Sequence, residues 1–153
     1  MRYWLLLIFT CLVFSSHPSR AGSLAHGPYR IHYTVIASTL IPAEVAKGHG
    51  IKRSENTGLV NIALRRADKP VPAEISGSVV NLLEQETNLA FEEVREQDAI
   101  YYLATHIAMP TDLLRFIVVV TPPIGDPATI KFMRRYDLWR LFLLVPIYTK
   151  RMK

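Results

Sequence analysis

One short polar segment holds the side chains best suited to binding a small ligand. It contains Lys52, Arg53, Ser54, Glu55 and Asn56, and Asn61 follows five positions later. An arginine guanidinium presents a planar fork that binds a carboxylate or a phosphate in two places, and neighbouring Asn and Ser side chains add neutral hydrogen bonds. The segment therefore predicts a binding site for an anionic ligand or partner, formed by Arg53, Ser54, Asn56 and Asn61. A structural loop is the alternative, in which Arg53 pairs with an acid such as Glu44 or Glu55 and the asparagines bond to the backbone.

Arg115 is a second candidate for ligand binding. It lies between Leu114 and Phe116, in a segment that we expect to be a central strand. An unpaired charge inside a protein is costly, so its face must be exposed to solvent or it must hold an acid such as Glu74 or Glu93. An arginine that faces a ligand is the remaining alternative.

The histidines do not show the spacing of a metal site. Those outside the first twenty-one residues are His26, His32, His49 and His106. His106 and Met109 are three positions apart, which on a strand puts their side chains on opposite faces and makes them a poor copper pair. We therefore expect no metal ion and no other cofactor.

Carboxylates crowd one predicted hairpin, but their arrangement does not favour catalysis. Glu92 and Glu93 are adjacent, so on a strand they point to opposite faces, and Arg95 is near enough to neutralise one of them. The chain also lacks a Gly-x-Ser-x-Gly motif and a Gly-rich phosphate loop. We expect no catalytic residues and favour a non-enzymatic protein, although the sequence alone leaves catalysis open.

The first twenty-one residues have the organisation of an export signal. A positive start is followed by an almost unbroken apolar run from Tyr3 to Phe14, and Ser19-x-Ala21 has the small-x-small form that signal peptidase recognises. The run is about a dozen residues long, whereas a helix that spans a bilayer needs about 20. These features predict cleavage before Gly22 and a periplasmic protein.

Charge and cysteine content exclude two further kinds of protein. The net charge is +5, yet residues 22–135 contain twelve Lys/Arg and twelve Asp/Glu, so the body of the chain is neutral. Affinity for nucleic acid requires cations clustered on one face, and we therefore exclude nucleic acid as a main partner. The only cysteine, Cys11, lies within the predicted signal, so the exported chain would have neither a disulfide nor a thiolate site.

The remainder of the chain predicts an all-β domain. Alternating or continuously apolar segments indicate about seven strands, near residues 29–38, 57–66, 74–83, 89–95, 99–109, 113–121 and 129–136. One short helix is expected after the first strand, from Pro42 to Lys47, and Gly77 suggests a bulge or a close backbone contact. Short strands at this spacing favour an antiparallel β-sandwich of immunoglobulin-like architecture, with a small barrel as the alternative.

The predicted organisation has four parts. They are a signal peptide at 1–21, a flexible mature N-terminus at 22–28, the sandwich domain at 29–136 and an apolar, basic tail at 137–153. The tail is too short to span a bilayer. Three interpretations of the tail remain open. It forms an extra edge strand or a packed ending, it makes a weak contact with a membrane surface, or a recent frame change has replaced an older ending.

Four sequence blocks resemble, in order and spacing, the DUF4426 family of small exported proteobacterial proteins. The blocks are IPAEVAKGHGIKRSENTGLVNIAL (Ile41 to Leu64), AEISGSVVNLL (Ala73 to Leu83), FEEVREQDAIYYLA (Phe91 to Ala104) and LLRFIVVVTP (Leu113 to Pro122). The resemblance implies a periplasmic β-sandwich and no assigned activity. Positions that match the family pattern are Arg53, Ser54, Asn56, Asn61, Gly77, Asn81, Tyr101, Tyr102, Arg115 and Phe116. The chain departs from the family after Tyr136.

Together these features predict an exported, non-enzymatic domain that binds a periplasmic protein or an envelope component through its loops or an edge strand. The alternative is a small-molecule-binding or hydrolytic domain that uses Arg53, Asn56 and Asn61. That alternative requires the three side chains to converge in one concave pocket.

Overall fold

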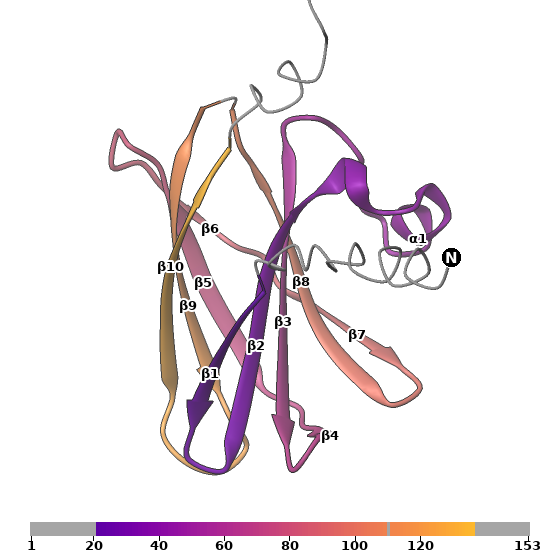
Figure 1. Cartoon of the computed structure of the whole chain (residues 1–153), viewed down its shortest axis with the longest axis vertical. Helices are drawn as coiled ribbons and strands as arrows, with labels where there is room; N and C mark the ends of the chain where they lie inside the picture. The colour runs from indigo at the N-terminus through magenta and orange to yellow at the C-terminus, as the bar shows by residue number, and fades with distance from the viewer. Residues whose placement is uncertain (1–20, 110, 137–153) are drawn as a thin grey trace, which may run out of the picture.

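Two antiparallel sheets pack face to face as a β-sandwich in this computed structural model, which describes residues 21–109 and 111–136 (Figure 1). The all-β sandwich predicted from strand spacing is confirmed, with one short α-helix after the early strands. The predicted tail and the predicted signal before Ala21 lie outside the described residues.

Sheet A has the strand order β1-β2-β3-β8-β7, and the short strand β4 pairs with the end of β3. Its strands are β1 (Gly22–His26), β2 (Tyr29–Ala37), β3 (Thr57–Arg66), β4 (Lys69–Pro70), β7 (Glu92–Glu96) and β8 (Ala99–Ile107). Sheet B has the order β10-β9-β5-β6. Its strands are β5 (Glu74–Val80), β6 (Glu86–Asn88), β9 (Leu113–Thr121) and β10 (Ala128–Arg135).

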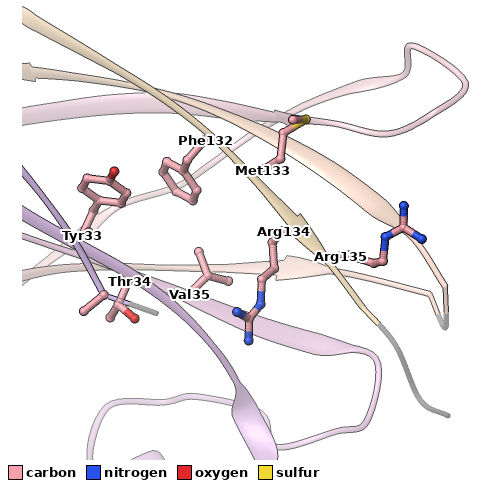
Figure 2. A pocket seen from close by; sticks show the side chains of 9 residues that line it. Tyr33, Thr34, Val35, Phe132, Met133, Arg134 and Arg135 are labelled. Carbon is pink, nitrogen blue, oxygen red and sulfur yellow. The ribbon is translucent and has the colours of Figure 1, made fainter. Parts of the chain in front are cut away.

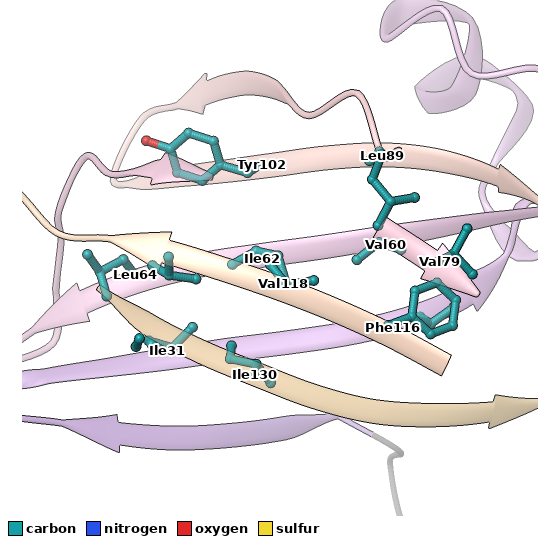
Figure 3. Packing of buried hydrophobic residues seen from close by; sticks show 14 of the residues in the cluster. Ile31, Val60, Ile62, Leu64, Val79, Leu89, Tyr102, Phe116, Val118 and Ile130 are labelled. Carbon is teal, nitrogen blue, oxygen red and sulfur yellow. The ribbon is translucent and has the colours of Figure 1, made fainter. Parts of the chain in front are cut away.

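The core lies between the sheets and follows from the period-two alternation of β3 and β9. Both strands send every second side chain inward, and these side chains are almost completely buried (Figure 3). They include Val60, Ile62, Leu64, Phe116, Val118 and Val120. Burying one such side chain contributes about 1.5–3 kcal/mol relative to leaving it in water. Because β9 lies between β10 and β5, the central position expected for its apolar run is confirmed.

A stack of aromatic rings joins the two sheets near their open edges. Phe116 on β9 stacks on Phe132 of β10 with 5.0 Å between ring centroids, and Phe132 stacks on Tyr33 of β2 at 4.9 Å. Stacked aromatic pairs add about 0.5–1.5 kcal/mol beyond the area that they bury. The stack therefore fixes the distance between β2 and β10, which are not hydrogen-bonded to each other.

A helical segment covers one end of the outer face of sheet A. The 3-10 helix η1 (Ser38–Leu40) and the helix α1 (Ala43–Gly48) follow β2, and Ile41 and Ala46 pack on Leu59 of β3. Within the described residues, no helix has the length and apolar character needed to cross a bilayer. The segment reaches only one end of the strands, and no other helix of the described residues lies over the outer face (Figure 1).

The structure differs from the sequence expectations at three short strands. Residues 22–28, expected to be flexible, contain β1, which pairs with β2 from Gly22 opposite Tyr33 to His26 opposite Tyr29. The strands β4 and β6 were also not expected. All three pair along one side only and are two to five residues long, too short for their own alternation to identify them.

Gly77 on β5 provides a test of how tightly sheet B is packed. A Cβ at this position would lie 2.7 Å from the carbonyl oxygen of Ile117 on the neighbouring strand, which confirms the close backbone contact expected there. Because a backbone carbonyl in a paired strand cannot move aside, Gly77→Ala should destabilise the domain by about 1–3 kcal/mol. The measurement is the free energy of unfolding from urea titration.

The matched control for this substitution is Gly48→Ala. A Cβ at Gly48 would meet no atom within 4 Å, and Gly48 ends α1 without a positive φ. This variant should be neutral or stabilising by up to about 1 kcal/mol, since alanine restricts the unfolded chain. Equal losses in both variants would show that the contact at Gly77 does not limit stability.

Candidate functional site

A groove lies between the edges of the two sheets of the sandwich. It has a volume of about 370 Å³ and lies between β2 and β10 (Figure 2). Tyr33, Val35 and Phe132 give it an apolar lining, and the side chain of Arg134 reaches across it toward β2. Alternation along β10 explains this arrangement, because Phe132 and Arg134 face the groove while Met133 points away and is 65% exposed.

The groove exists because β1 is shorter than the strand beside it. β1 pairs with residues 29–33 of β2 only, while β2 continues to Ala37. Among the described residues, no strand pairs with Thr34 to Ala37 on that side, and β10 pairs only with β9. Edge backbone groups of this kind are a template for another strand.

A buried polar pair closes one end of the sandwich. Nε2 of His106 is hydrogen-bonded to the hydroxyl of Tyr136, and the imidazole meets the ring of Phe116 edge-on with 4.9 Å between centroids. Burial lowers the pKa of His106 to about 4 and raises the pKa of Tyr136 to about 12, so both groups are neutral at pH 7. Room for the imidazole comes from Gly58, where a Cβ would lie 2.3 Å from its Cε1.

The polar loop singled out from the sequence has structural contacts. Nη2 of Arg53 donates a hydrogen bond to the carbonyl of Thr39 at 2.9 Å, and not to Glu44 or Glu55. The backbone N–H of Ser54 donates to the hydroxyl of Ser38 at 2.9 Å. These bonds tie the loop to η1 and leave Arg53 without a carboxylate partner among the described residues.

Asn56 contributes to the same loop mainly through its backbone. Its N–H donates to the hydroxyl of Ser54, and its carbonyl accepts a hydrogen bond from the N–H of Ala108 at 3.0 Å. The hydroxyls of Ser54 and Thr57 are also within 2.9 Å of each other. These contacts are the ones expected of a structural loop.

Asn61 and Arg115 lie on opposite sides of the molecule. Asn61 is on the outer face of sheet A, opposite Thr34 of β2, and its Oδ1 atom is buried without a hydrogen-bond partner among the described residues. Arg115 is on the exposed outer face of sheet B and forms an ion pair with Glu84, and not with Glu74 or Glu93. The five predicted site residues therefore do not line one cavity.

Carboxylates on β7 also take structural partners. Glu93 pairs with Arg95 and accepts a hydrogen bond from the hydroxyl of Tyr102 at 2.9 Å. The Arg95 hydrogen bond, followed by the Tyr102 hydrogen bond, lowers the pKa of Glu93 below its usual range. Tyr102 points inward and its hydroxyl accepts a hydrogen bond from the N–H of Ala73, while Tyr101 points outward, because adjacent side chains on a strand face opposite ways.

Residues 23–136 match the family described as "Domain of unknown function (DUF4426)". The chain belongs to the DUF4426 family. The match begins inside β1, so β1 is part of the family domain, and it ends at Tyr136, the residue after which the sequence departs from the family pattern.

Solved structures of other proteins share this fold. A DUF4426 family protein from Pseudomonas aeruginosa PAO1 is 28% identical, with a TM-score of 0.70, and the alignment covers 76% of this chain and 94% of that protein. Two structures of FetP from uropathogenic Escherichia coli strain F11 are each 12% identical. The copper-bound variant has a TM-score of 0.57, and its alignment covers 75% of this chain and 93% of FetP. FetP as isolated has a TM-score of 0.58, with 76% of this chain and 93% of FetP covered. At this identity the FetP likeness shows the fold alone. No curated protein matches the chain.

The buried imidazole predicts a specific loss of stability in acid. The pKa of His106 is about 4 in the folded chain and near 6.5 when unfolded, so the unfolded state binds more protons between these values. The contribution of the neutral His106 imidazole to the free energy of unfolding is fully present above about pH 6.5 and is lost as the pH falls toward 4. Between about pH 7 and 4.5, wild type should lose about 2–3 kcal/mol more than His106→Leu in urea unfolding.

Comparison with the variant is needed because carboxylates also titrate in this range. If wild type and His106→Leu lose the same stability between the two pH values, the imidazole is accessible to protons in the folded state. That result would contradict the buried, neutral pair.

Proposed function

We propose that this DUF4426 domain is exported and binds a periplasmic protein or envelope component by adding a strand of the partner to the free edge of β2. One observation carries the proposal: β2 extends four residues beyond β1, beside an apolar groove with a second strand edge across it. Strand addition supplies backbone hydrogen bonds, and pockets for alternate side chains supply specificity.

The groove limits the chemistry of the partner segment. An extended segment paired with residues 34–37 would direct every second side chain into the space lined by Val35, Tyr33 and Phe132, which favours apolar residues. Arg134 reaches into the same space, and no ion pair to it is formed among the described residues. A carboxylate in the partner would satisfy this guanidinium in a partly desolvated site.

Export is supported by the position of the predicted signal relative to the fold. The predicted cleavage site precedes Gly22, the first residue of β1, so cleavage would leave the sandwich intact. One of the similar structures, FetP as isolated, was made by expression in the periplasm of E. coli.

Copper binding, as in the FetP variant, is not part of the proposal because the side chains do not fit it. Within the described ranges, no three His, Cys, Asp or Glu residues lie close enough to hold a metal ion. His106 is buried against Phe116, whereas Met109 is 55% exposed beyond the end of β8. His49 instead lies 3.3 Å from a carboxylate oxygen of Glu96.

Other functions considered from the sequence have less support. A small-molecule or hydrolytic site built from Arg53, Asn56 and Asn61 needs a shared pocket, which the placement of these residues does not provide. Membrane contact through the tail at 137–153 concerns residues outside the described ranges and stays a prediction.

Photo-cross-linking in cells tests the proposed edge. Thr34→p-benzoylphenylalanine places a reactive group at the free edge of β2, and Thr87→p-benzoylphenylalanine places it on β6, an edge of sheet B. We expect an adduct from position 34 only, with a partner peptide of alternating apolar residues and at least one carboxylate. Arg134→Glu should reduce its yield by about tenfold or more, because it replaces an attraction by a repulsion.

Arg115→Glu is the charge control for this experiment, since Arg115 lies on the outer face of the other sheet. It should leave the adduct unchanged. Equal adducts from positions 34 and 87, or no adduct from position 34, would contradict strand addition at β2.

A further inference from the structure

The outer face of sheet A carries a second, polar concavity that is separate from the core. It has a volume of about 480 Å³ and spreads over β2, β3 and β8, on the part of the face that α1 does not cover. Its principal side chains are Arg30, His32, Asn61, Arg65, Asp68 and Tyr101. We call it the outer hollow.

Two arginines lie directly opposite each other in the outer hollow. Arg30 on β2 is paired in register with Arg65 on β3, and alternation places both side chains on the outer face, since Ile31 and Leu64 are buried in the core. Like charges opposite each other on neighbouring strands destabilise a sheet. A sheet retains such a pair at a cost in stability, and an anion bound between the two guanidinium groups would offset that cost.

The charge of the outer hollow is not balanced from within. Neither Arg30 nor Arg65 forms an ion pair with a described residue, and Arg65 donates only to the backbone carbonyl of Asp68. Among the described residues that line the hollow, only Asp68 carries a carboxylate. Two guanidinium charges against one carboxylate leave a formal charge of +1.

Asn61 supplies a second, independent indication of a ligand. Its Oδ1 atom is buried and has no hydrogen-bond partner among the described residues, although its side chain borders the outer hollow. A buried polar atom without a partner costs about 1–3 kcal/mol, so such atoms are rare in folded proteins. A turn of the side-chain amide about χ2 would present Oδ1 to the outer hollow, where a hydrogen bond donated by a ligand hydroxyl would remove this cost.

We propose that the outer hollow binds a small hydroxyl-bearing organic anion, namely a sugar that carries a phosphate or a carboxylate group. Arg30 and Arg65 contact the anionic group, because a guanidinium fork matches the oxygen spacing of phosphates and carboxylates. Asn61 accepts a hydrogen bond from a sugar hydroxyl. The half-buried ring of Tyr101 offers an apolar surface to the sugar ring.

Titration of the purified protein, produced from the full-length chain, tests this proposal by NMR. Glucose 6-phosphate and glucuronate supply the two anionic groups, glucose is the neutral control, and inorganic phosphate lacks hydroxyls on carbon. We expect both sugar anions to shift the backbone amides of His32, Asn61 and Ala63, and the shifts to weaken as salt is raised to about 0.5 M. Glucose should cause none, and inorganic phosphate should bind more weakly than glucose 6-phosphate.

Substitutions locate the site. Arg30→Gln and Arg65→Gln should each weaken binding of both sugar anions by about tenfold or more, since each removes a charge-assisted contact. Asn61→Ala should reduce the preference for glucose 6-phosphate over inorganic phosphate. Arg115→Gln is the matched control, an exposed arginine on the opposite sheet, and should leave binding unchanged.

Folding of the variants is checked separately. Arg30 has no hydrogen bond or ion pair within the described residues, so Arg30→Gln should unfold at the same temperature as wild type or at a higher one. Absence of amide shifts up to about 20 mM sugar anion would overturn the proposal. Equal weakening by Arg115→Gln, or equal binding of neutral glucose, would also overturn it.

Discussion

Apolar contact between the two sheets is the interaction on which the rest of this structure depends. The only cysteine is Cys11, which lies outside the described residues, and no cluster of metal ligands occurs within them, so no covalent or metal link joins sheet A to sheet B there. Cohesion comes from the inward side chains of β3 and β9 and from the ring stack of Phe116, Phe132 and Tyr33. Because the inner faces are occupied by packing, binding has to use strand edges, end loops or outer faces.

The sequence allowed the long strands to be predicted because their signal is local. The bounds expected for β3 and β9, residues 57–66 and 113–121, agree with the structure. In β3 every second residue is apolar, and in β9 a continuous apolar run marks the strand. Register is not local, because it depends on which residues of distant strands face each other. Arg30 and Arg65 are thirty-five positions apart and become neighbours only through the pairing of β2 with β3. The outer hollow could therefore not be predicted from the sequence.

In the polar loop the sequence signal is local, but the fold decides whether that signal indicates an anion-binding site or a structural loop. Arg53, Ser54 and Asn56 have the side chains of an anion site, yet their bonds run to η1, to Thr57 and to the end of β8. A loop between a helix and a central strand has many backbone groups to satisfy, and Ser and Asn are suited to that task. Asn61 differs because it lies inside a strand, where its neighbours already satisfy the backbone, and its Oδ1 atom is left without a partner.

The groove and the outer hollow meet at one strand, which links the two proposals physically. Thr34 borders both: it is the first residue of β2 beyond β1, and it lies opposite Asn61 on β3. A strand added along residues 34–37 would cover the rim of the outer hollow and reduce the exposure of its cations to solvent. Lower solvation strengthens the attraction of Arg30 and Arg65 for an anion that is already bound, but it also hinders entry of a free one. Binding at either surface would thereby change the affinity at the other, by the same factor in both directions.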